Sequence, residues 1–176
     1  MIKPEKNVYV SEKNEVDNTW TENWTIANLK LMTEIRKSYA ENKTVLSEYL
    51  NISEIKSPVL IYRYSKNICP DCITKDLDKL ANLQSITGKD KILILPAFDG
   101  TRNDRVILAN DLSRFNYKNI PNELLVIPYD SMFMIRPYYA VINQTENIEM
   151  IFFPQRNNQK LTDIYFSEIK RIINMQ

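Results

Sequence analysis

The chain contains no histidine, only two cysteines and no second cysteine pair. A zinc ion in a protein normally has four ligands, so a site built within this chain would need carboxylates in place of the missing imidazoles and thiolates. We therefore expect no structural zinc, no other metal and no cofactor.

Two cysteines are also too few for a disulfide-stabilised scaffold. They are Cys69 and Cys72, and a bridge between them would close so short a loop that it would restrain the unfolded chain very little. We therefore expect the pair to have a reactive role rather than to form a stabilising disulfide.

The chain has no excess of either charge and no long apolar run. It has 23 Lys and Arg against 22 Asp and Glu, a net charge of +1, which gives no basic surface for nucleic acid. No stretch approaches the roughly 20 apolar residues that span a bilayer, and residues 1–19 lack the apolar core of a signal peptide. We expect no nucleic-acid partner and no membrane span.

The sequence leaves the cellular compartment open: periplasm or cell envelope is favoured if a signal was removed before Met1, and the cytoplasm otherwise. The oligomeric state is also open.

The N-terminal quarter has weak local signals. The first twenty residues are polar without periodicity, which predicts an extended or partly disordered arm. From about 21 to 41, helical spacing predicts an amphipathic helix whose core-facing residues are Leu29, Met32, Ile35 and Tyr39. Residues 45–57 read as a short helix or loop ended by Pro58. Trp20 and Trp24 either clamp the arm to the body or form a binding surface, and packing favours the clamp.

The rest of the chain, with 44% hydrophobic residues overall, reads as one compact unit in which strands and helices alternate. Strands are expected at 59–65, 91–98 and 124–127. One helix is expected between the first two strands, with the cysteine motif in its first turn and Ile73, Leu77, Leu80 and Ile86 on its apolar face, and another at 103–116. Gly88 should cap the first of these helices. After a loop at 129–135, residues 138–143 and 148–153 read as an antiparallel hairpin, and a last helix carries an apolar face of Leu161, Ile164, Tyr165, Ile169 and Ile172. The fold class is α/β, with parallel pairing among the first three strands.

The motif Cys69-Pro70-Asp71-Cys72 follows the first of these strands, and Arg136-Pro137 precedes the hairpin. With this order of elements, the chain from about Val45 to Met175 resembles the thioredoxin superfamily, in particular its TlpA-like and peroxiredoxin-related branch. The resemblance implies a three-layer α/β/α sandwich with a mixed central sheet over residues 45–176, preceded by an arm and helix at 1–44.

The resemblance also implies roles for residues around the motif. Pro137 would be a cis-proline lying against the cysteines, whereas the simpler alternative is a proline that starts a strand. Arg136 either favours the thiolate of Cys69 or is an ordinary solvated arginine. Two positions depart from the family pattern: Ile68 replaces the usual aromatic residue, and Arg63 replaces a buried acid that helps to deprotonate the second cysteine. Either another acid substitutes or Cys72 reacts less readily.

The position of the motif at a helix start suggests its chemistry. A cysteine before the first helical turn faces unpaired N–H groups and the positive end of the helix dipole, so Cys69 is the expected nucleophile. Pro70 suits the first helical position, and Cys72 lies close enough to resolve a mixed disulfide. The negative charge of Asp71 opposes ionisation of the sulfur, so we expect a relatively reducing couple.

These features predict a thiol-disulfide oxidoreductase that exchanges disulfides with protein substrates and is turned over by an unidentified redox partner. The alternative is a thioredoxin-like binding or scaffolding module whose CxxC motif is vestigial, because a fold does not by itself establish an activity. A peroxidase is not expected, since the pattern around the peroxidatic cysteine of such enzymes is missing.

Overall fold

A computed structural model describes residues 9–51, 58–130, 134–155 and 158–174 of the chain. Within these ranges the elements follow in the order α1 (Tyr9–Leu50), β1 (Val59–Ser65), α2 (Pro70–Thr87), η2 (Lys89–Lys91), β2 (Ile92–Ala97), α3 (Arg102–Asp111), β3 (Asn116–Tyr117), β4 (Tyr129–Asp130), β5 (Met134–Ile135), β6 (Tyr138–Ile142), β7 (Ile148–Phe152) and α4 (Gln159–Asn174).

The main sheet has five strands in the order β3-β2-β1-β6-β7. Strands β1, β2 and β3 are parallel, while β6 runs antiparallel to both β1 and β7. The predicted strands 59–65 and 91–98, the hairpin and the mixed α/β class are therefore confirmed. Strand β1 lies at the centre and six of its seven residues are buried, as expected of a strand covered on both faces.

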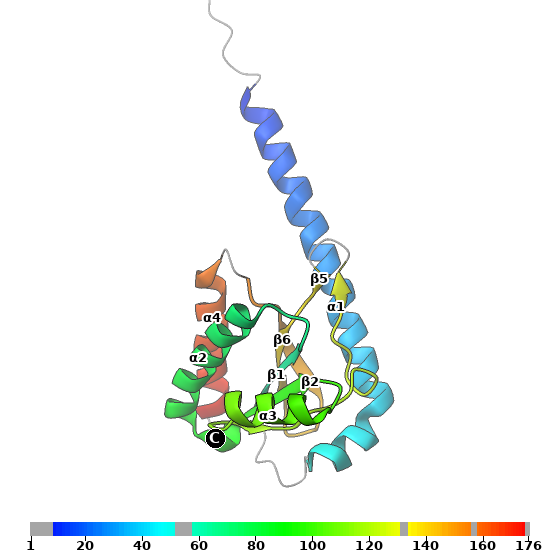
Figure 1. Cartoon of the computed structure of the whole chain (residues 1–176). Helices are drawn as coiled ribbons and strands as arrows, with labels where there is room; N and C mark the ends of the chain where they lie inside the picture. The colour runs from blue at the N-terminus through cyan, green and yellow to red at the C-terminus, as the bar shows by residue number, and fades with distance from the viewer. Residues whose placement is uncertain (1–8, 52–57, 131–133, 156–157, 175–176) are drawn as a thin grey trace, which may run out of the picture.

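Helices cover both faces of this sheet (Figure 1). Ile61 of β1 belongs to a core cluster with the buried residues of α1, while Leu60 and Tyr62 belong to a second cluster with those of α2, α3 and α4. The alternation of side chains along β1 thus divides the core into an α1 side and an α2 side.

The N-terminal expectations need correction. Residues 9–50 form one helix, not an arm, a helix from 21 and a separate segment from 45; the expected division at 44–45 falls inside this helix. The sequence holds neither glycine nor proline between residues 5 and 57, so nothing local interrupts it. Its first turns extend away from the sheet in Figure 1. Residues 1–8 and 52–57 lie outside the described ranges.

The buried stripe of α1 is also displaced from the predicted one. Ile35 and Tyr39 are buried as expected, and Met32 is half-buried, but Leu29 is 57% exposed and Leu31 takes its place in the core. Farther along, Leu46 and Leu50 extend the same stripe to the end of the helix. The helix therefore packs on the sheet through its C-terminal half.

The predicted strand 124–127 is wrong: this segment is a turn and loop, and the third parallel strand is the two-residue β3. Side chains engage the backbone groups that a strand would have paired. The Val126 N–H donates to Ser38 Oγ (3.0 Å) and the Ile127 N–H to Asn122 Oδ1 (2.7 Å). The predicted loop 129–135 instead contains the short β4–β5 ladder.

Helix faces and helix ends were both predicted only in part. Helix α3 ends at Asp111 rather than 116, yet Leu108, Leu112 and Phe115 are all buried. In α4, Tyr165 and Ile169 are buried, but Leu161 and Ile164 are exposed while Thr162, Phe166 and Ile173 face the core. Gly88 ends α2 as predicted, with a φ of 95° and its N–H on the Gln84 carbonyl at 2.9 Å.

Candidate active site

Cys69 is the residue immediately before α2, and its side chain is exposed. Its carbonyl accepts from the N–H groups of Cys72 (3.0 Å) and Ile73 (3.2 Å), which closes the first turn of the helix. Pro70 is the first helical residue, where the missing N–H costs no hydrogen bond. Cys69 is therefore exposed at the positive end of the dipole of an 18-residue helix.

Cys72 faces the interior of the protein. It is half-buried and packs, together with Ile73, against the core cluster on the α2 side of the sheet. Residues three apart on a helix are neighbours on its surface. The motif thus presents one thiol to solvent and the other to the core.

The loop at 66–68, between β1 and the cysteine motif, is held by a buried side chain, a backbone hydrogen bond and an ion pair. Ile68 is buried, and its N–H bonds the Ser65 carbonyl at 3.2 Å. Lys66 pairs with Asp99, which connects this loop to the one after β2. That hydrogen bond to Asp99 is the main cause of the raised pKa of Lys66.

Pro137 lies at the same end of the sheet as the two cysteines. Arg63 of β1 pairs with Tyr138 of β6, so one further step in the antiparallel register places Pro137 beside Tyr64, next to the point where β1 runs into the Cys69 loop. Pro137 is half-buried. The pairing of β1 with β6 thus brings Pro137 and the loop that leads to Cys69 to the same end of the sheet.

The Arg136 side chain lies on the α1 side of the sheet, and Asp71 is exposed. The Arg136 N–H bonds the Pro128 carbonyl (3.1 Å), and its guanidinium lies 5.1 Å from the centre of the Phe153 ring, which belongs to the α1-side core. Cys72 packs against the cluster on the other side of the sheet. Asp71 is exposed in the first turn of α2.

Arg63 occupies the position where the resemblance expects a buried acid, and it is completely buried. Its guanidinium donates to main-chain carbonyls at 2.7–3.1 Å, and burial lowers its pKa to about 10. The acceptors are the carbonyls of Leu95, Pro96, Ile120, Pro121 and Leu125. The side chain therefore fastens the 120–125 segment to the end of β2.

A buried acid is present nonetheless, at Asp76 of α2, which the sequence reading missed. Asp76 is 8% exposed, and its Oδ2 accepts from the Tyr62 hydroxyl at 2.7 Å. Burial, and then the charge of Asp76, raise the pKa of Tyr62 well above its ordinary value of 10.0. The acid stands four residues after Cys72, on the same helix face. A signal was available, since position 76 falls within the apolar spacing of Ile73, Leu77 and Leu80.

Aromatic rings enclose this acid. Tyr62 stacks on Tyr139 with ring centres 4.8 Å apart and on Tyr64 at 5.4 Å, and all three are buried. The pKa of Tyr139 is likewise raised by burial and by the charge of Asp76. Asp76 thus lies in an environment of low polarity behind the half-buried cysteine.

No helix in the described ranges is long and apolar enough to cross a membrane. Neither a scan against models of known protein families nor a search of curated proteins found a match to this chain, so its function is inferred from its own residues and their geometry.

Proposed function

We propose that the protein is a thiol-disulfide oxidoreductase with a thioredoxin-like three-layer fold. The observation that carries the proposal is the placement of the cysteine pair. Cys69 is exposed before the first turn of α2, after the loop that follows the central strand β1, and Cys72 is half-buried one turn later within α2. The positive end of the helix dipole stabilises a thiolate at such a position.

In the first step the Cys69 thiolate attacks a disulfide of a client protein. A bond forms between Cys69 Sγ and one client sulfur, the client S–S bond breaks, and the other client sulfur leaves as a thiolate that takes up a proton. The backbone beside Pro137 lies at the same edge of the sheet, where an extended client segment would pair with it.

In the second step Cys72 attacks Cys69 Sγ. A Cys69–Cys72 disulfide forms, the client is released as a thiol, and two electrons have moved from the protein to the client. A dithiol partner must then reduce the protein again. Asp76 is the candidate acceptor for the proton of Cys72, since it is buried one turn away on the same face.

The test is a redox titration of the cysteine pair against a thiol buffer, read by alkylation of thiols and mass. We expect one reversible two-electron transition. Cys69→Ser should abolish reduction of a disulfide substrate, while Cys72→Ser should accumulate a mixed disulfide with the client. The exposed Ser85→Ala, on the same helix, serves as the control for handling and folding.

A protein whose native cysteines show no reversible transition would contradict this proposal. The same result would favour the alternative, a binding or scaffolding module with a vestigial motif. In that case Cys69→Ser would leave partner binding unchanged.

A further inference from the structure

The carboxylate of Asp76 is held by a phenol on the neighbouring strand. The Tyr62 hydroxyl of β1 donates to Asp76 Oδ2 of α2 at 2.7 Å, and Tyr62 has no exposed surface. A hydrogen bond to a charged acceptor is shorter and stronger than one between neutral groups. Tyr62 therefore influences both where this carboxylate lies and how readily it carries a charge.

The groups concerned lie together on the α2 side of the sheet. Cys72 packs against the core cluster that contains Tyr62. Asp76 follows Cys72 by four residues in α2, so the two side chains are neighbours on one helix face. The hydroxyl of Tyr62 thus reaches the carboxylate from the strand, while Cys72 lies beside it along the helix.

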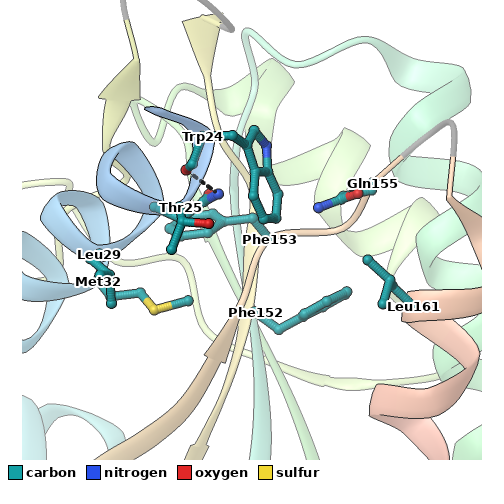
Figure 2. Close-up of a pocket in the computed structure, with 9 residues that line it drawn as sticks. Trp24, Thr25, Leu29, Met32, Phe152, Phe153, Gln155 and Leu161 are labelled. Carbon is teal, nitrogen blue, oxygen red and sulfur yellow. Dashed lines mark hydrogen bonds between the residues drawn. The ribbon is translucent and has the colours of Figure 1, made fainter. Parts of the chain in front are cut away.

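Stacked rings fix the position of Tyr62. Its ring stacks on that of Tyr139 with centres 4.8 Å apart, and Tyr139 in turn stacks on Phe152 and Tyr165. In Figure 2 the Phe152 ring extends from β7 toward Leu161 of α4. Side chains in a close-packed interior occupy defined rotamers. The hydroxyl of Tyr62 is therefore a preorganised donor.

Tyr62 keeps its own proton, which separates its role from that of a base. Burial, and then the charge of Asp76, raise its pKa well above 10.0, so near neutral pH the hydroxyl donates and takes no proton from a thiol. Burial also raises the pKa of the other phenols around the carboxylate, which stay protonated as well. They are Tyr64 of β1, Tyr139 of β6 and Tyr165 of α4, and the charge of Asp111 of α3 acts on Tyr64. Asp76 is thus the group of this cluster that can accept the Cys72 proton near neutral pH.

We propose that Tyr62 is a positioning residue for the second step: its hydroxyl fixes the Asp76 carboxylate, in the charged form, beside Cys72. The proton passes from Cys72 Sγ to the carboxylate, and the new thiolate attacks Cys69 Sγ. The bond between Cys69 and the client breaks as the bond between the two cysteines forms, and the departing client sulfur takes up a proton. The inference rests on the proposed function, because it concerns the resolution of the mixed disulfide.

The first measurement follows Asp76 itself. Full-length protein is isotopically labelled at the aspartate carboxyl groups, and NMR follows their signals against pH. The Asp76 signal is the one that is absent from Asp76→Asn. Tyr62→Phe keeps the ring and removes the donor. Because a hydrogen bond to the charged form of an acid favours that form, the midpoint of the Asp76 titration should rise by about one pH unit or more.

The second measurement follows the reaction, with glutathione disulfide as the client. Quenched-flow alkylation and mass spectrometry give the decay rate of the mixed disulfide between Cys69 and glutathione at a series of pH values. In Tyr62→Phe the midpoint of this pH profile should rise in step with that of Asp76, while the rate at high pH changes little. A merely structural role would lower the rate equally at every pH. In the Asp76→Asn background, Tyr62→Phe should have no further effect on the profile.

The matched control is Tyr165→Phe, which removes a buried hydroxyl of the same cluster whose partner is the Met150 carbonyl at 3.0 Å. It should leave both midpoints unchanged. Circular dichroism checks that each variant is folded. If Tyr62→Phe does not fold, 3-fluorotyrosine at position 62 keeps the ring and the hydroxyl and is the stronger donor, so both midpoints should fall.

Equal Asp76 midpoints in wild-type and Tyr62→Phe protein would overturn the positioning role, and so would a rate lowered equally at every pH. A wild-type protein that forms no mixed disulfide would instead contradict the proposed function, and the role of Tyr62 in the reaction would be refuted with it. The wild-type reaction thus distinguishes the two failures.

Discussion

Arg63 stands where the resemblance to the thioredoxin superfamily expects a buried acid, and it has a structural role there. A charged side chain with no exposed surface is stable only if its donors are satisfied. Here main-chain carbonyls from β2 and the 120–125 segment satisfy them. The residue at the expected acid position thus acts as a structural anchor for the loop that replaces the predicted strand 124–127.

Replacing Arg63 by methionine should therefore destabilise the protein strongly. The change takes a donor away from each of five main-chain carbonyls, and a buried acceptor left unsatisfied costs about 1–3 kcal/mol. Arg63→Lys should also be destabilising, because a lysine cannot reproduce the planar fork of donors. Urea unfolding followed by circular dichroism measures both effects. The exposed Arg105→Met is the control, and a similar small effect at both positions would refute the anchoring role.

The motif and Pro137 could be placed from the sequence because each adjoins a recognisable strand, and the register of β1 with β6 brings Pro137 to the end of the sheet where β1 runs into the Cys69 loop. The roles of these residues stay a prediction. The sequence could not locate Asp76 or the acceptors of Arg63. Charged residues are normally exposed, and their burial depends on partners distant in sequence. For Arg63 those partners lie 32 to 62 residues away along the chain.

At the scale of elements, α2 combines two tasks on one face. Leu77, Leu80 and Leu83 pack into the core, while Cys72 and Asp76 place a thiol and a carboxylate along the same stripe. A neutral side chain of the same shape at position 76 would keep the packing and remove the proposed proton acceptor.

Asp76→Asn should accordingly slow the second step of the proposed reaction. We expect decay of the mixed disulfide between Cys69 and the client to slow by about tenfold or more, since a positioned base usually contributes at least that much. Raising the pH should restore the rate, because hydroxide then removes the Cys72 proton. Quenched-flow alkylation and mass spectrometry follow the decay.

The matched control is Asp78→Asn, which removes an exposed carboxylate from the same helix. Equal rates in the two variants would exclude a role for Asp76 in proton transfer. A rate that stays low at high pH would indicate a structural defect instead.

Element types were predictable where periodicity was strong, as in β1, β2 and the hairpin. The wrong predictions concern segments whose secondary structure is determined by tertiary contacts. A polar helix such as the start of α1 has no apolar period, and the strand-like segment 124–127 is held as a loop by Ser38 and Asn122. Two-residue strands such as β3 have no sequence signal of their own.

At the scale of the whole molecule, buried phenols dominate the response to alkaline pH. Burial is the largest cause of a raised pKa in six tyrosines, and for Tyr39 the value rises from 10.0 to about 12. The others are Tyr62, Tyr64, Tyr138, Tyr139 and Tyr165. The unfolded chain therefore loses these protons at a lower pH than the folded protein does.

The free energy of unfolding should consequently stay level with respect to these groups below pH 10 and fall as the pH rises above it. Arg63 acts in the opposite direction, since its pKa is lowered to about 10, but it is one group against six. Urea unfolding at a series of pH values measures the trend. Unchanged stability from pH 9 to pH 12 would contradict it.

Strand β1 is hydrogen-bonded on one side to β2 and on the other to β6, and it leads directly into the loop that carries Cys69. A central strand of this kind opens only when a large part of the molecule unfolds. The cysteine motif thus follows directly on a segment of backbone that is among the last to open.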